Sequence, residues 1–221
     1  METTSQLKAV VFDSDGTLMN TEELIIAAYQ HVATQHELRP PSRDQIMVHM
    51  GKSLKEIYAG LFPKHPDHDQ LVAANGAFIL DHVLETQGYD GLEDLLRALR
   101  GDGLMLGLLT GGDHKVAALL EHHGIAHYFG SVVHSELIEK QKPDPEGLQL
   151  VLHELGVQPD QAVMVGDMRY DILAGKNAGV RATIGVTHGF GTRQELQQAG
   201  ADRIVSNLPE LLTVLQDDYL S

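Results

Sequence analysis

The stretch Val10–Leu18, which reads VVFDSDGTL, joins a short apolar run to two carboxylates and a glycine. A short apolar run bounded by turn residues is typical of a buried strand. In an extended chain, residues two apart point to the same side, so Asp13 and Asp15 are expected to face one another. Such a pair is unfavourable unless a cation or a shared proton relieves it. Gly16 permits a tight turn, and the Thr17 hydroxyl is expected to bond to nearby backbone.

Alone, this stretch also fits a strand followed by an ordinary acidic turn, but three downstream segments favour a functional interpretation. Thr110 follows the apolar run Met105–Leu109, Lys142 opens the sequence KPDP, and residues 166–171 read GDMRYD. In this order and spacing, the four segments resemble the motifs of the haloacid-dehalogenase-like (HAD) hydrolases. The likeness is strongest to the phosphoglycolate-phosphatase-like branch, and it extends over nearly the whole chain.

Outside one central region, strand and helix signals alternate, which predicts an α/β fold with a parallel sheet. Several predicted helices end at a glycine followed by apolar residues, a pattern typical of a helix end that leads into the next strand. The expected strands are Lys8–Phe12, Met105–Thr110, Ser131–His134, Ala162–Val165, Arg181–Val186 and Arg203–Val205. We therefore expect a Rossmann-like three-layer core. Its site would lie beyond the carboxyl ends of the strands, where Asp13, Thr110, Lys142 and Asp167 fall.

The region 20–88 lacks this alternation and is expected to be all helical. The expected helices are Glu22–His36, Ser42–Met50, Leu54–Phe62 and Asp67–Gln87. Two of the helix starts, at Ser42 and Ser53, match the capping-box pattern. The resemblance implies that this region is a helical cap domain (20–88) inserted into an α/β core domain (1–19 and 89–221). The alternative is that these helices pack directly on the sheet as part of one domain.

Composition narrows the class of protein. The chain has 221 residues and is 43% hydrophobic, which suits one α/β domain with a modest insertion. It has no cysteine, which excludes disulfides and thiol chemistry. Residues Met1–Leu7 do not resemble a signal peptide, and no stretch approaches the roughly 18 apolar residues of a membrane span. We therefore expect a soluble, cytoplasmic protein.

The net charge of −15 disfavours binding to nucleic acid and to anionic membranes. It also repels phosphate esters, so an enzyme acting on them would need a local cationic site, which a divalent metal and Lys142 would supply. The expected partner is a small phosphorylated metabolite. Neither nucleic acid nor membrane is expected as a partner, and the chain is expected to be a monomer or a weak homodimer.

The resemblance implies distinct roles for the two carboxylates of the first motif. Asp13 would be the nucleophile that forms an aspartyl-phosphate. Asp15 would protonate the leaving oxygen and then deprotonate the attacking water. The family pattern also implies a Mg²⁺ ion bound by Asp13, Asp167 and the backbone carbonyl of Asp15, since magnesium prefers oxygen ligands. Asp171 is expected to support this ligand shell rather than to bind the metal.

Phosphate binding is expected from the other two motifs. Thr110 offers a hydroxyl, and Gly111 and Gly112 would leave backbone N–H groups open to an anion. Lys142, rather than the nearby Lys140, is the cation expected to bind phosphate and to screen Asp13, because the residue before a proline is held extended.

Some other residues carry weaker signals. The glycines at 185, 189 and 191 do not have dinucleotide-loop spacing and are better interpreted as a glycine-rich turn. His188 lies in a loop that could reach the edge of the site. Lys52 lies between two predicted cap helices, in a connection that approaches the core site in the resembled family. Lys52 is therefore our candidate for a substrate contact, although a solvated lysine would fit the sequence as well.

Together these features predict a magnesium-dependent phosphatase that hydrolyses a small phosphomonoester through an aspartyl-phosphate. A β-phosphoglucomutase-like phosphomutase needs the same groups and stays open as an alternative. A catalytically silent binding module is a weaker alternative, because every reacting group is present. The substrate is left open among phosphoglycolate, sugar phosphates, nucleoside monophosphates and pyrophosphate.

Overall fold

The computed structural model describes residues 6–220 and divides the chain into two compact units. The first unit contains the described residues up to Asn20 together with the chain from Gly88 onward, and the second is Thr21–Gln87. Residues 1–5, which belong to the predicted core domain, and residue 221 lie outside the described residues. Within residues 6–220, none of the helices has the length and apolar character needed to cross a membrane.

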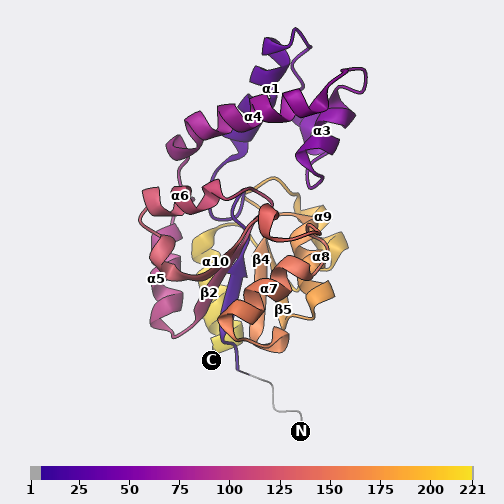
Figure 1. Cartoon of the computed structure of the whole chain (residues 1–221). Helices are drawn as coiled ribbons and strands as arrows, with labels where there is room; N and C mark the ends of the chain where they lie inside the picture. The colour runs from indigo at the N-terminus through magenta and orange to yellow at the C-terminus, as the bar shows by residue number, and fades with distance from the viewer. Residues whose placement is uncertain (1–5, 221) are drawn as a thin grey trace. The chain divides into compact units, whose positions relative to one another are not determined.

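The first unit is built on a parallel sheet, as the alternating pattern predicts (Figure 1). Six strands pair in the order β3-β2-β1-β4-β5-β6. Their bounds are β1 Ala9–Phe12, β2 Met105–Leu109, β3 Phe129–Val133, β4 Ala162–Gly166, β5 Ala182–Val186 and β6 Arg203–Val205. Every strand coincides with an expected one to within two residues at each end. Buried apolar runs thus identified the central strands, whereas the edge strands β3 and β6 are only partly buried.

Helices cover both faces of the sheet, which gives three layers (Figure 1). The helices of this unit are α5 Leu92–Gly101, α6 Lys115–His122, α7 Glu146–Leu155, α8 Arg169–Ala178, α9 Arg193–Ala199 and α10 Leu208–Leu215. Short helical turns are η2 Ala126–Tyr128, η3 Ser135–Leu137, η4 Pro159–Gln161 and η5 Gln216–Leu220. Ala9 and Val11 of β1 pack with Leu148 and Val151 of α7 in one buried cluster. Since side chains alternate along a strand, this side of β1 is also the side of Asp13.

The register of the central strands brings the predicted site residues to one edge. Phe12, the last residue of β1, is level with Leu108 of β2 and Val165 of β4. Consequently Asp13, Thr110 and Asp167 all follow neighbouring strands at their carboxyl ends. The Asp13 N–H donates to Val165 O at 2.9 Å, which continues the ladder into the site.

The second unit is helical and has its own core. It contains α1 Glu22–Gln35, α2 Arg43–Met47, α3 Leu54–Leu61, α4 His68–His82 and the short turn η1 Val83–Glu85. Buried side chains from these helices include Tyr29, Ile46, Tyr58 and Leu71. Buried Asn75 donates its amide to the Tyr58 hydroxyl at 2.9 Å, which satisfies both polar groups.

The structure confirms both capping boxes in the second unit and corrects two helix ends. Ser42 and Ser53 each accept the backbone N–H three residues on, and Gln45 and Glu56 complete the two boxes. The helix expected over Ser42–Met50 ends at Met47, and the one expected over Asp67–Gln87 is α-helical only to His82. Helix ends are set by local capping that apolar periodicity does not report.

Candidate active site

Backbone hydrogen bonds close the turn after β1, which carries the two carboxylates of the first motif. Ser14 O accepts the N–H groups of Leu18 and Met19 at 2.9 and 3.0 Å, and Gly16 has φ of +79°. A methyl group added to Gly16 would lie 2.5 Å from Asp167 Oδ2, so this position needs glycine for space as well as for conformation. Asp13 is buried at the base of the turn, and Asp15 is partly exposed.

Lys142 is the cation that reaches Asp13. Its ammonium lies 2.7 Å from Asp13 Oδ1 and 2.6 Å from Asp171 Oδ1, and it also donates to Leu109 O at 3.2 Å. Lys140 is instead exposed, with its ammonium 3.7 Å from Asp144. Of these two lysines, Lys142 is therefore the one placed beside Asp13.

Asp167 is held by two hydrogen bonds in a fully buried position. Its Oδ1 accepts the Thr17 hydroxyl at 2.9 Å, and its Oδ2 accepts the Phe190 N–H at 2.7 Å. The expectation that the Thr17 hydroxyl bonds to nearby backbone is therefore wrong. The turn points this hydroxyl across the sheet edge to Asp167, where a buried carboxylate is a stronger acceptor than a backbone carbonyl.

A loop after β5 closes tightly over Asp167. A methyl group added to Gly189 would lie 2.2 Å from Gly16 O and 2.4 Å from Asp167 Oδ2, and one added to Gly191 would lie 2.1 Å from Asp167 O. His188 Nε2 lies 2.9 Å from Thr17 O, so this loop also holds the β1 turn. The position of His188 after a strand indicated that this loop could reach the edge of the site. The sequence did not predict that Gly189 and Gly191 pack against Asp167, because these glycines fit an ordinary turn as well.

Asp171 is buried and bonds to Lys142 and to the start of α8. One oxygen faces Lys142, and the other accepts the Met168 N–H at 2.9 Å at the start of α8. A methyl group added to Gly166 would lie 2.2 Å from the Asp171 Cβ. Only glycine at position 166 therefore leaves room for the Asp171 side chain. Both oxygens of Asp171 thus have partners within the protein.

The Thr110 turn differs from expectation at one N–H group. Thr110 is buried, and its own N–H donates to Val133 O at 3.0 Å. The Gly112 N–H donates to the Thr110 hydroxyl oxygen at 3.0 Å, so it is not open to an anion in this structure. Nothing lies within 4 Å of a methyl group placed on Gly111, and one placed on Gly112 would lie 3.7 Å from Asp15 Oδ2. The surface of this turn therefore faces Asp15.

Burial shifts the pKa values of the site's charged groups. Burial raises the pKa of Asp13 to about 7, although Lys142 opposes the shift. Burial and the neighbouring Asp13 and Asp171 raise the pKa of Asp167. For Lys142, burial acts against the charged form, but Asp13 and Asp171 outweigh it and raise the pKa of the ammonium. The cluster thus concentrates negative charge that a further cation would relieve.

The donor set fits a hard divalent cation. Within residues 6–220, Asp13, Asp167 and Asp171 form the one group of three acidic or histidine side chains whose ligand atoms all lie within 4.8 Å of one another. All of these donors are oxygens, which Mg²⁺ prefers over the nitrogen and sulfur ligands typical of zinc. Hydrogen bonding does not separate the three carboxylates, because both oxygens of Asp167 and both oxygens of Asp171 accept hydrogen bonds within the protein, and Lys142 also pairs with Asp13. Asp13 and Asp167 stay the predicted direct ligands, as the resemblance implies.

Lys52 lies in the second unit. It is exposed in the turn between α2 and α3, where Gly51 has φ of +85° and Ser53 begins the next helix. The Lys52 N–H donates to His49 O at 3.3 Å, which stabilises the turn. A contact between Lys52 and a substrate stays a prediction.

Comparison with known proteins identifies the family. The sequence model of the haloacid dehalogenase-like hydrolase family matches residues 10–185 of this chain. A pyrophosphatase PpaX from Bacillus pumilus is 33% identical over 215 residues, which cover 97% of this chain and 99% of the relative. A pyrophosphatase PpaX from Listeria monocytogenes is 32% identical over 223 residues, with 97% and 99% covered. The chain belongs to the haloacid dehalogenase-like hydrolases.

Solved structures agree with this assignment. A predicted phosphatase from Clostridium acetobutylicum superposes with a TM-score of 0.84 at 26% identity, covering 96% of this chain and 100% of that one. A protein described as a candidate β-phosphoglucomutase from Thermotoga maritima has a TM-score of 0.78 at 28% identity, with 96% and 100% covered. The predictions of the family, of the Rossmann-like α/β fold and of a HAD-type hydrolase are thus confirmed.

Proposed function

We propose that this protein is a magnesium-dependent phosphatase that hydrolyses a small phosphorylated metabolite through an aspartyl-phosphate. One observation carries the proposal: the Lys142 ammonium lies 2.7 Å from Asp13 Oδ1 in a buried cluster at the carboxyl end of a parallel sheet. A lysine in this position would contact both the nucleophilic carboxylate and the phosphoryl group, and its positive charge would reduce the repulsion between them.

The covalent step is assigned to Asp13. Its Oδ1 faces Lys142, so Oδ2 is the oxygen that would attack phosphorus and displace the leaving oxygen in line. Lys142 would stabilise the negative phosphoryl oxygens while Asp171 holds the lysine in place. The Thr110 hydroxyl and the Gly111 N–H would orient the same phosphoryl group.

Proton transfer is assigned to Asp15. A partly exposed carboxylate beside the Gly112 surface has room to reach the leaving oxygen. It would donate its proton to that oxygen and then take a proton from the water that hydrolyses the aspartyl-phosphate. Asp13 and Asp167 would hold Mg²⁺, which supplies positive charge for the phosphoryl oxygens and lowers the repulsion of the nucleophile.

The substrate class is proposed from the relatives. Two of them, at 33% and 32% identity, are named pyrophosphatases, which makes pyrophosphate the first compound to test. Phosphoglycolate, a sugar phosphate and a nucleoside monophosphate complete the panel. We propose that the protein acts in the cytoplasm as a monomer or weak homodimer. We expect no nucleic-acid or membrane partner, given its net charge of −15.

The decisive experiment measures phosphate release from an aryl phosphate and from this panel, with Mg²⁺ and with excess chelator. We expect turnover that chelation abolishes and Mg²⁺ restores. Full activity in chelator would refute the metal assignment. If the protein turns over no compound of the panel, with Mg²⁺ or with chelator, the result would favour a catalytically silent binding module instead.

A phosphomutase is the second candidate, favoured by the structural similarity to the Thermotoga maritima protein. The two activities differ in where the phosphoryl group of the aspartyl-phosphate goes. A phosphatase releases inorganic phosphate from a sugar phosphate, whereas a mutase returns the group to the sugar as an isomer. Product analysis with a sugar phosphate as substrate separates them.

We propose that Lys52 contacts the leaving group of the physiological substrate. Lys52→Ala should then lower kcat/KM for that substrate and spare a small aryl phosphate, because remote binding energy serves only the larger ligand. Lys64→Ala, which removes another exposed lysine of the same unit, is the matched control. Unchanged kcat/KM for the best substrate would contradict the contact.

A further inference from the structure

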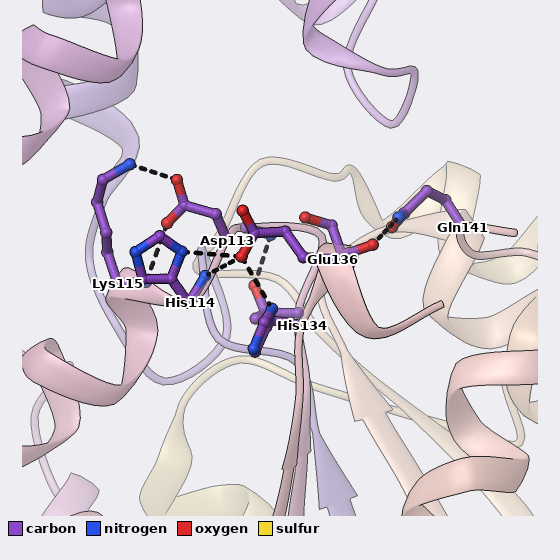
Figure 2. Close-up of polar contacts among 9 residues, drawn as sticks. Asp113, His114, Lys115, His134, Glu136 and Gln141 are labelled. Atoms are coloured by element: carbon purple, nitrogen blue, oxygen red, sulfur yellow. Dashed lines mark hydrogen bonds and ion pairs between the residues drawn. The ribbon is translucent and has the colours of Figure 1, made fainter. Parts of the chain in front are cut away.

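The turn after β2 is tied to the turn after β3 by hydrogen bonds that the proposed mechanism does not use (Figure 2). We call residues 110–114 the β2 turn and residues 134–137 the β3 turn. The Ser135 N–H donates to Gly112 O at 2.9 Å, and Glu136 Oε2 accepts the His114 N–H at 3.3 Å. Gln141, one residue before Lys142, donates its amide to Ser135 O at 3.3 Å.

Glu136 is the centre of this connection. Figure 2 shows its carboxylate between the rings of His114 and His134, with His114 Nδ1 2.8 Å from Oε2. His134 Nδ1 lies 3.6 Å from the same oxygen. Hydrogen bonds from His114 lower the pKa of Glu136, so this side chain is an anion at neutral pH. One exposed carboxylate oxygen of Glu136 therefore accepts hydrogen bonds from both the backbone N–H and the ring Nδ1 of His114.

The two glycines of the β2 turn are held by backbone hydrogen bonds to Gly112 and by no packing around Gly111. Gly111 and Gly112 both have negative φ, so neither glycine is required by its backbone conformation. A methyl group on Gly111 would meet nothing within 4 Å, so no packing holds this residue either. Two consecutive glycines give a turn more conformational freedom than other residues do. The turn is restrained at Thr110 by Val133, at Gly112 by the Thr110 hydroxyl and the Ser135 N–H, and at His114 by Glu136. Glu136 is the side chain that fixes its C-terminal end.

We propose that Glu136 is a positioning residue for phosphate binding. It fixes the C-terminal end of the β2 turn so that the Thr110 hydroxyl and the Gly111 N–H are already oriented when a phosphoryl group arrives. Without Glu136 the His114 end of the turn would have to be ordered on binding, which weakens binding of any phosphoryl group regardless of what is attached to it. This inference rests on the proposed function, because it assumes that the β2 turn binds phosphate.

The test compares inhibition by inorganic phosphate in the full-length wild type and in Glu136→Ala, with an aryl phosphate as substrate. We expect the inhibition constant for phosphate and the KM of the substrate to rise by about three- to tenfold, the range for losing one or two hydrogen bonds to an exposed charge. The affinity for Mg²⁺ and the thermal unfolding midpoint should stay near wild type. Glu136→Gln keeps an acceptor for the His114 N–H and should recover part of the loss.

Glu93→Ala is the matched control, because Glu93 is also exposed and pairs with Arg97 on α5. An inhibition constant in Glu136→Ala equal to that of wild type would overturn the proposal, as would an equal rise in Glu93→Ala. A rise accompanied by losses of Mg²⁺ affinity and thermal stability would also overturn it, because that pattern indicates general disruption. If wild type neither turns over the aryl phosphate nor binds inorganic phosphate, the proposed function itself fails.

Discussion

The two sides of the candidate site hold their charged groups in opposite ways. On the side of β1 and β4, Asp13 and Asp167 are 7% and 0% exposed, and the Lys142 side chain is 11% exposed. On the side of β2 and β3, the side chains of His114 and Glu136 are 67% and 53% exposed. The proposed covalent chemistry belongs to the buried side. The exposed side is proposed only to shape the turn that would meet the phosphoryl group.

This difference teaches how far each side can tolerate change. Buried charges have lost their water, so removing one partner leaves another uncompensated, which is strongly destabilising. Exposed ion pairs typically contribute about 0–1 kcal/mol because water replaces a lost partner. Substitutions on the buried side should therefore change chemistry or metal binding by large factors. Those on the exposed side should give graded effects.

The largest effect is expected for Asp13→Asn. Loss of the nucleophilic carboxylate should lower kcat by orders of magnitude, because the amide does not form the aspartyl-phosphate. Asp15→Asn keeps the nucleophile and should lower kcat by about 10²–10⁴-fold, through proton transfer alone. Steady-state kinetics with rapid chemical quench measures both. Phosphate trapped on a residue other than Asp13 would refute the assigned roles.

The next largest effect is expected for Gly189→Ala. The added methyl group would lie 2.2 Å from Gly16 O, so the loop must move away from Asp167. Because outer contacts orient metal ligands, the affinity for Mg²⁺ should fall roughly 10- to 100-fold, as titration calorimetry would measure. Gly101→Ala, where the methyl group meets nothing within 4 Å, is the control and should bind as wild type does. Equal affinity in all three proteins would show that this loop does not position Asp167.

A smaller effect concerns pH and Mg²⁺ together. The pKa of Asp13 is about 7 in the folded protein against 3.8 for an ordinary aspartate, so the folded state binds this proton more tightly than the unfolded state. The metal-free protein should therefore lose stability as pH rises between these two values. Magnesium competes with that proton, so its stabilising effect should be larger at about pH 8 than at about pH 5.5. Thermal unfolding with and without Mg²⁺ measures this, and equal stabilisation at both pH values would contradict it.

The smallest effect is expected for Asp113→Asn on the exposed side. Asp113 pairs with Lys115 at the start of α6, and it accepts the Lys115 N–H at 3.0 Å. Asparagine keeps that acceptor and loses only the ion pair, so stability should change by less than about 0.5 kcal/mol, and kcat/KM should hardly change. Denaturant unfolding and steady-state kinetics would check this. A large loss in either would mean that the contrast between the two sides is wrong.

The sequence predicted the sheet well because most of its strands are local apolar runs, and a parallel sheet aligns the ends of such runs. The motif residues after β1, β2 and β4 accordingly fall at one edge. What escaped prediction depends on contacts between distant loops. The Phe190 N–H bond to Asp167, the Gly112 N–H bond to Thr110 and the position of Glu136 leave no periodic signal. Backbone donors in particular are invisible in a sequence, since every residue except proline has one.

The pairing of Met19 with Gly88 makes the helical unit a loop that is closed at its base. These two residues form an antiparallel bridge, and the Tyr89 N–H donates to Leu18 O at 2.9 Å, so the chain leaves and rejoins the α/β unit at a single point. The entropy lost in closing a long loop grows only with the logarithm of its length. The free energy of folding of the α/β unit therefore depends only weakly on the number of residues between Met19 and Gly88. The inserted helices can accordingly be exchanged, in evolution or by engineering, without changes to the sheet.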